Sequence, residues 1–323
     1  MSNFIFSLNV TIPVFLMILI GFFLRKFNLI GEKFVSDANK YVFKCALPVM
    51  LFKDIAESDI LKNANIKFIL FCMCVTILMF SVVWIFSYIF IKDKSLVGAF
   101  AQGASRGSAA ILGVAFVENI CGNAGMAPLM IVAAVPFFNI LSVIILTFSA
   151  EFDQKNKSRT IRIHKFGIIK KSLVQIVKNP IIIGIFLGMP FAFFKIPIYT
   201  IPDKVIGYIA QTATPIALIA IGGGFDKTEA VTRIKTALAA SIIKLIILPA
   251  VFLPFAALFD FNSSEVAAIL IMLASPTTVS CYIMAKNMDN DGPLTSDIIM
   301  ITTVLSSLTL TGWIFILKTV CLI

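Results

Sequence analysis

The chain has 323 residues, of which 59% are hydrophobic and 14% are charged. Soluble domains have about 45–50% apolar and about 25% charged residues, so this composition excludes an ordinary soluble protein. The formal net charge of +10 indicates cytoplasmic loops that face anionic lipid, rather than a nucleic-acid partner.

Apolar blocks of about 20 residues recur along the chain, and each is long enough to cross about 30 Å of hydrocarbon. The first block, residues 4–24, follows no basic residue and is too long for a signal peptide, so we expect it to be retained. Ten transmembrane helices are predicted, at about residues 4–24, 37–55, 67–91, 96–117, 126–149, 178–194, 205–224, 236–259, 265–285 and 296–317.

The basic residues orient these spans in the bilayer. Sixteen lie in loops on one side and five on the other. The positive-inside rule places the richer side in the cytoplasm and both termini outside. The longest polar stretch, residues 150–172, is then a basic cytoplasmic connector, and the sequence leaves open whether it is regulatory. We expect a multi-pass protein of the cytoplasmic membrane.

Identical residues that recur at one fixed separation along the chain indicate an internal repeat. Residues of the same type lie 167 positions apart at Pro13 and Pro180, Gly21 and Gly188, Pro48 and Pro215, and Ser108 and Ser275. The matches divide the chain into a first repeat, residues 1–149, and a second, residues 173–323, each with five predicted spans. Because five is odd, the second repeat is inverted, which is typical of secondary transporters.

Two of the predicted spans are interrupted near their middle. In the fourth, glycines and serines surround Arg106 in the stretch GASRGSAAILG. In the ninth, Pro276 follows Ser275, and proline removes a helical hydrogen bond and clashes with the preceding turn. Both sites lie about ten residues into their spans, or about 15 Å, so both are near the midplane.

Arg106 is the strongest candidate for a functional residue. A guanidinium at the centre of a bilayer costs at least about 2.5–3.5 kcal/mol and needs a partner. None of the 17 acidic residues is central in a predicted span, and broken helices add positive half-helix N-termini. These features predict a carboxylate-binding site; the alternative is that Arg106 bonds backbone carbonyls or reaches a loop acid.

Two further polar residues have open interpretations. Asn139 follows Pro136 in the fifth span and is either a site amide or an interhelical hydrogen bond. We expect Lys244 in the eighth span to snorkel, the alternative being a second cation for the substrate.

Other chemistry has little support in the sequence. The six cysteines are scattered and His164 is the single histidine, so we expect no metal site, no disulfide framework and no cofactor. HExxH does not occur and no paired carboxylates lie in the middle of a predicted span, so we expect no enzymatic activity.

Several motifs in order resemble those of the auxin efflux carrier (AEC) family of membrane transporters, with its bacterial malate/malonate-type branch. They are IPVFLMILIGFFLRKFNLI, ALPVMLF, the RG-S stretch of the fourth span, NPIIIGIFLG and P-x-x-L-x-x-x-G-G. Ser108 replaces the family's usual Asn, and Ala115 replaces its usual Pro. These departures make transfer of one relative's substrate unsafe.

The resemblance implies an all-α membrane protein of ten helices in two inverted five-helix repeats, with helices 4 and 9 broken and crossing. It implies a scaffold of spans 1, 2, 6 and 7, a mobile transport domain of spans 3–5 and 8–10, elevator-type alternating access and a homodimer. The expected substrates are small organic anions, such as malate, malonate or auxin-like acids.

Rival functions remain open at this point. They are a sodium-coupled symporter that resembles the bile acid symporters, and a non-transporting sensor or channel. The sequence leaves open the anion, the direction of transport and the coupling ion, proton or sodium. The candidate substrate-binding residues are Arg106, Gly107, Ser108, Asn139, Ser275, Pro276, Thr277 and Thr278.

Overall fold

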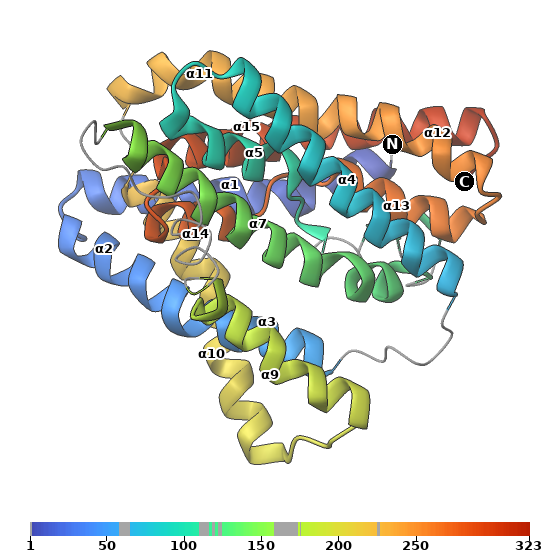
Figure 1. Ribbon diagram of the computed structural model, residues 1–323, viewed down its shortest axis with the longest axis horizontal. Coiled ribbons are helices and arrows are strands. Elements are labelled where there is room, and N and C mark those ends of the chain that lie inside the picture. The colour runs from blue at the N-terminus through green and yellow to red at the C-terminus, as the bar shows by residue number, and fades with distance from the viewer. Residues whose placement is uncertain are drawn as a thin grey trace.

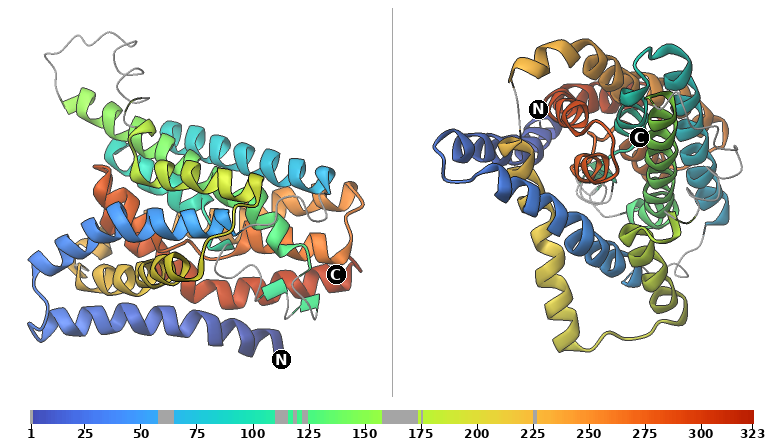
Figure 2. Two further views of the ribbon diagram at one scale, coloured as in Figure 1. Left: turned by 90° about the horizontal axis from the view of Figure 1, so that it is seen from below. Right: turned by 60° about the vertical axis from the view of Figure 1, so that its left-hand side comes forward.

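The computed structural model describes residues 2–57, 65–109, 116–117, 120–121, 125–157, 174, 176–224 and 227–323, and these residues are predominantly helical (Figure 1). The helices are α1 (Ser2–Lys26), α2 (Glu32–Tyr41), η1 (Val42–Ala46), α3 (Leu47–Ala56), α4 (Ile66–Phe90), η2 (Lys94–Leu96), α5 (Val97–Ser105), α7 (Ala127–Lys157), α9 (Pro180–Phe194), α10 (Thr200–Gly223), α11 (Lys227–Ile242), η3 (Ile243–Ile247), α12 (Leu248–Leu258), α13 (Ser263–Ala274), α14 (Ser280–Asn287) and α15 (Gly292–Thr319). Both chain ends lie at the same end of the molecule (Figure 2).

Length and composition identify five helices that could cross a membrane within the described ranges. They are Ile66–Phe90, Ala127–Ala150, Thr200–Gly223, Arg233–Leu258 and Gly292–Thr319. Two shorter apolar helices, Pro180–Phe194 and Ser263–Ala274, fall within the predicted sixth and ninth spans. The predicted connector at 150–172 falls largely outside the described residues, as does Ala115.

The second and eighth predicted spans each contain a π-helical turn just before a proline. The turn η1 precedes Pro48 and the turn η3 precedes Pro249. Proline lacks an N–H and its ring clashes with the carbonyl four residues earlier, so the widened turn lets each helix continue. The second of these turns contains Lys244.

Buried apolar side chains form two large clusters. The first draws on α4, α5, α7, α11, α12, α13 and α15. The second draws mainly on α1, η1, α3, α9 and α10, with a few residues of α7, α14 and α15. Within the second group α3 packs along α9 and α1 packs along α10, while α1 also contacts α15 of the first group.

Glycines allow close backbone contact in the second cluster. A Cβ on Gly21 of α1 would lie 2.4 Å from the carbonyl oxygen of Ile219 in α10. A Cβ on Gly188 of α9 would lie 2.8 Å from the carbonyl oxygen of Phe52 in α3. Gly188 lies 167 residues after Gly21, and Ile219 lies 167 residues after Phe52, so the two contacts are related by the offset of the predicted repeat.

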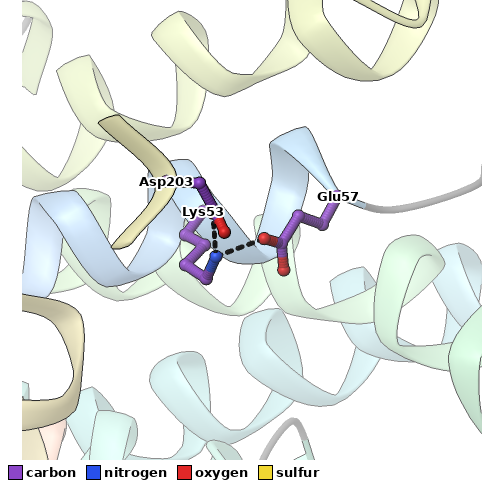
Figure 3. A network of polar contacts seen from close by, with 3 residues as sticks. All are labelled: Lys53, Glu57 and Asp203. Carbon is purple, nitrogen blue, oxygen red and sulfur yellow. Dashed lines mark hydrogen bonds and ion pairs between the residues drawn. The ribbon is translucent and has the colours of Figure 1, made fainter. Parts of the chain in front are cut away.

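A polar network joins α3 to the first turn of α10 (Figure 3). The Lys53 Nζ donates to carboxylate oxygens of both Glu57 and Asp203. Asp203 lies 150 residues further along the chain, so the contact is tertiary. Exposed ion pairs contribute about 0–1 kcal/mol, so this network adds little to the free energy of unfolding.

Candidate functional site

The helices α5 and α13 both stop inside the molecule. The helix α5 ends at Ser105, and Arg106 continues in extended conformation with φ −84° and ψ 118°. The helix α13 ends at Ala274, and Ser275 is extended with φ −65° and ψ 149°. The ninth predicted span resumes only at α14, so it is interrupted where Pro276 predicts a break.

The two extended segments lie against each other. Gly107 and Thr277 form an isolated antiparallel β-bridge. The Ser108 N–H donates to the Pro276 carbonyl at 2.8 Å, and the Thr277 Oγ1 donates to the Gly103 carbonyl at 2.7 Å. These bonds satisfy backbone groups that the helix ends leave free, as non-helical backbone at membrane depth requires.

Further polar groups of the ninth span surround this crossing. The Thr277 N–H donates to the Thr302 Oγ1 of α15 at 3.1 Å. The hydroxyls of Thr278 and Ser280 lie 3.4 Å apart. The Ser275 Oγ is buried and has no hydrogen-bond partner among the residues that the structure describes.

Arg106 is buried at the crossing, with 5% of its surface exposed. Its Nη2 donates to the Asn139 Oδ1 at 2.7 Å, and its Nη1 lies 2.8 Å from the Met284 Sδ. The Asn139 Nδ2 donates to the Val135 carbonyl, which orients the amide with its oxygen toward the guanidinium. Asn139 thus contacts Arg106 directly.

The partners of Arg106 are electrically neutral. Within the described parts of the chain no acidic side chain lies within ion-pair distance of it. A thioether is a weak acceptor, and a guanidinium has five N–H donors. The site therefore keeps a positive charge and hydrogen-bond capacity for a stronger acceptor.

A small cavity of about 30 Å³ lies beside Arg106. Its walls are Met50, Leu51, Asp54, Arg106, Gly107, Ser108, Val135, Phe138, Thr278 and Ser280. A larger, mainly apolar cavity of about 210 Å³ shares Leu51, Asp54 and Val135 with it and lies between α3 and α9 on one side and α4 and α7 on the other. The Arg106 site therefore lies between elements of the two apolar clusters.

The structure brings all eight candidate residues to one place, with different surroundings. Four of them, Arg106, Gly107, Ser108 and Thr278, line the small cavity. Asn139 accepts a hydrogen bond from Arg106, which lines the cavity. Thr277 forms its hydrogen bond within the crossing of the two extended segments. The Pro276 carbonyl accepts the Ser108 N–H, and the Ser275 hydroxyl is buried.

Two residues at the site, Asp54 and Met284, were not predicted from the sequence. Asp54 lies near the end of the second predicted span, a position from which no cavity contact was expected, yet it lines the Arg106 cavity. Met284 is an apolar residue whose sulfur contacts Arg106, and nothing in its sequence position distinguishes it.

The prediction that Lys244 snorkels to the headgroups is wrong. Lys244 is completely buried, and its Nζ donates to the carbonyls of Ser105 at 3.1 Å and Leu273 at 2.7 Å. The reason is that free carbonyls at the ends of α5 and α13 accept the hydrogen bonds of the Lys244 ammonium, so the side chain needs no acceptor among the headgroups.

Apolar helices, two of them interrupted at a buried charged site, define a multi-pass membrane protein of the transporter class. The chain belongs to the family described as "Membrane transport protein", whose model matches residues 6–314. This is the family of the auxin efflux carriers, so the resemblance is confirmed at the level of the family.

Three curated relatives are similar over most of their length. "Uncharacterized transporter MJ1031" of Methanocaldococcus jannaschii is 22% identical over 318 residues, 96% of this chain and 98% of the relative. An "Uncharacterized transporter" of Methanothermobacter thermautotrophicus is 20% identical, with 96% and 98% covered. A "Putative malonate transporter" of Rhizobium meliloti is 21% identical, with 96% and 95% covered.

Proposed function

We propose that this membrane transporter is a secondary carrier of small organic anions in the cytoplasmic membrane. Its substrates are carboxylates, such as malate or malonate, or auxin-like acids. The observation that carries the proposal is the buried guanidinium of Arg106, which contacts a neutral amide and a thioether rather than an acid. A carboxylate could complete this site with two parallel hydrogen bonds.

The groups around Arg106 suit an anion. The helix α14 begins at Ser280 beside the cavity, and helix N-termini favour negative charge. The hydroxyls of Thr278 and Ser280 supply further donors at the same wall. The relative from Rhizobium meliloti, which is named as a malonate transporter, supports the same class of substrate.

The size of the cavity indicates that the substrate needs a more open state. A volume of about 30 Å³ accommodates little more than one water molecule and is too small for a dicarboxylate. In our proposal the walls from α3 move away from the walls that Arg106, Gly107 and Ser108 provide. The substrate then binds while the two sides are apart.

The two apolar clusters support an elevator mechanism. We propose that spans 1, 2, 6 and 7 form the scaffold and that spans 3–5 and 8–10 form the transport domain, which shifts as a unit. The contacts related by the 167-residue offset support two inverted five-helix repeats. A homodimer with both termini outside completes the proposal.

Uptake by proteoliposomes tests the function. Purified protein is reconstituted and supplied with labelled malonate, malate, citrate or indole-3-acetate. We expect saturable uptake of at least one of them. Replacement of Arg106 removes a charged hydrogen bond worth about 1.5–3 kcal/mol, so Arg106→Ala should weaken affinity by about 10- to 150-fold.

Two further variants sharpen that test. Arg106→Lys keeps the charge but cannot form the bidentate hydrogen bonds of a guanidinium, and we expect an intermediate loss of affinity. Lys44→Ala removes a charge from the exposed side of η1 and should leave uptake unchanged. Equal uptake by wild-type, Arg106→Ala and Arg106→Lys protein would remove the role of Arg106.

A further inference from the structure

The buried ammonium of Lys244 occupies an unusual position. It lies on the π-turn η3 and has 0% of its surface exposed. None of the acidic residues in the described ranges pairs with it. A lysine charge at this depth is costly unless backbone carbonyls or an acid compensate it, and here the compensation comes from carbonyls.

Those carbonyls belong to both broken helices. The Lys244 Nζ lies 3.1 Å from the Ser105 oxygen at the end of α5. It lies 2.7 Å from the Leu273 oxygen and 3.4 Å from the Met272 oxygen near the end of α13. An ammonium has three donors and no acceptor, so three carbonyl partners match the charged form of the side chain.

Two negative helix ends therefore converge on one cation. Each helix C-terminus is equivalent to about half a negative charge, so a single positive charge balances the pair. In secondary transporters, half-helix C-terminal ends and unwound carbonyls are the groups that coordinate a sodium ion. Here the Lys244 ammonium already donates hydrogen bonds to the carbonyl oxygens at these helix ends.

A fourth oxygen lies in the same place. A Cβ on Gly107 would be 2.4 Å from the Ser275 Oγ and 2.9 Å from the Lys244 Nζ, so both atoms approach the same face of Gly107. The Ser275 Oγ is buried and lacks a hydrogen-bond partner within the described residues. Three carbonyls and one hydroxyl are a ligand set that a small hard cation accepts.

We propose that the Lys244 ammonium is a tethered substitute for a coupling cation, and that this carrier works without sodium. The side chain holds the two half-helices together permanently, where a bound ion would do so only in the loaded state. The inference goes beyond the proposed anion transport, and its first test does not depend on it.

The first test measures the melting temperature, Tm, of the purified protein. Wild-type Tm should be the same in sodium chloride and in choline chloride at equal ionic strength. In Lys244→Ala the oxygens are released, and saturating sodium should raise Tm by roughly 5 °C. The control, Lys235→Ala, removes an exposed lysine from α11 of the same continuous helix and should show no sodium response.

The outcomes separate clearly. A saturable sodium-dependent rise in wild-type Tm would overturn the proposal. A folded Lys244→Ala protein whose Tm does not change with sodium would also overturn it. Purification of Lys244→Ala only in sodium buffer would support it. If that variant folds in neither buffer, the wild-type titration decides alone.

Transport provides a second measurement. Wild-type uptake from sodium and from choline medium should agree within about twofold, because no sodium-linked step exists. Uptake that requires sodium would overturn the tethered-cation proposal while leaving anion transport intact. Absence of uptake in both media would count against the proposed substrates, whereas the Tm result would still stand.

Discussion

Gly107 and Lys244 lie so close together that a Cβ on Gly107 would come within 2.9 Å of the Lys244 Nζ. The same Cβ would lie 2.4 Å from the Ser275 Oγ. Gly107→Ala should therefore push the ammonium away from the helix ends and open the crossing. We expect a loss of about 1–3 kcal/mol of stability, the usual cost of overpacking, measured as a lower Tm, and reduced uptake.

Gly312→Ala is the matched control for this substitution. Gly312 lies in α15, and a Cβ there would meet nothing within 4 Å. Alanine favours a helix interior by up to about 1 kcal/mol over glycine, so Tm should stay the same or rise. If Gly107→Ala behaves like Gly312→Ala, the close approach at the crossing is not required.

The glycines between α1 and α10 allow a second prediction. A Cβ on Gly222 would lie 1.9 Å from the carbonyl oxygen of Ile18, and backbone cannot move aside as a flexible side chain can. Gly222→Ala should separate the two helices and lower Tm by more than Gly207→Ala, since Gly207 has only the Lys53 Cε nearby, at 3.9 Å. Equal Tm values in the two variants would contradict tight packing at this contact.

The sequence predicted much of the crossing because its residues have strong local preferences. Proline cannot continue a helix, so the break at Pro276 follows from chemistry alone. Arg106 and Asn139 were both candidates because each is costly in lipid without a partner. The structure adds that they are partners of each other, at 2.7 Å, which depth in the bilayer alone does not determine.

Lys244 and Asp54 show where sequence reasoning stopped. The snorkelling prediction for Lys244 assumed that the headgroups were its best available acceptors, but carbonyls of two other helices lie closer. Asp54 has an unremarkable depth near the end of a span, and its cavity contact depends on how α3 faces α5 and α7. Both assignments need tertiary packing, which a single sequence does not supply.

Asn139→Asp tests whether Arg106 must lack an acidic partner. The new carboxylate would replace an amide oxygen 2.7 Å from the Arg106 Nη2 and form an internal ion pair. We expect uptake to fall strongly because the pair occupies the guanidinium. The second carboxylate oxygen would replace the Nδ2 donor that faces the Val135 carbonyl, so the gain from the ion pair is offset and Tm should not rise. Asn28→Asp adds the same charge in an exposed turn, where φ is 58° and Asp is tolerated, and should transport normally. Normal uptake by Asn139→Asp would contradict anion binding at Arg106.

Asp54→Asn tests the effect of the acid that lines the Arg106 cavity. In our proposal an anionic substrate enters the cavity that Asp54 shares with Arg106, so the two negative charges repel. At about 4 Å this repulsion is about 1 kcal/mol in water and about 4 kcal/mol near a protein surface, so removing it should lower KM at least several-fold. Asp37→Asn, an equal change of charge on the exposed surface of α2, should leave KM unchanged. The measurement is the concentration dependence of anion uptake by the three proteins.

A KM that rises in Asp54→Asn would show that this carboxylate assists substrate binding, for example by orienting Arg106. That result would refute repulsion as its main effect.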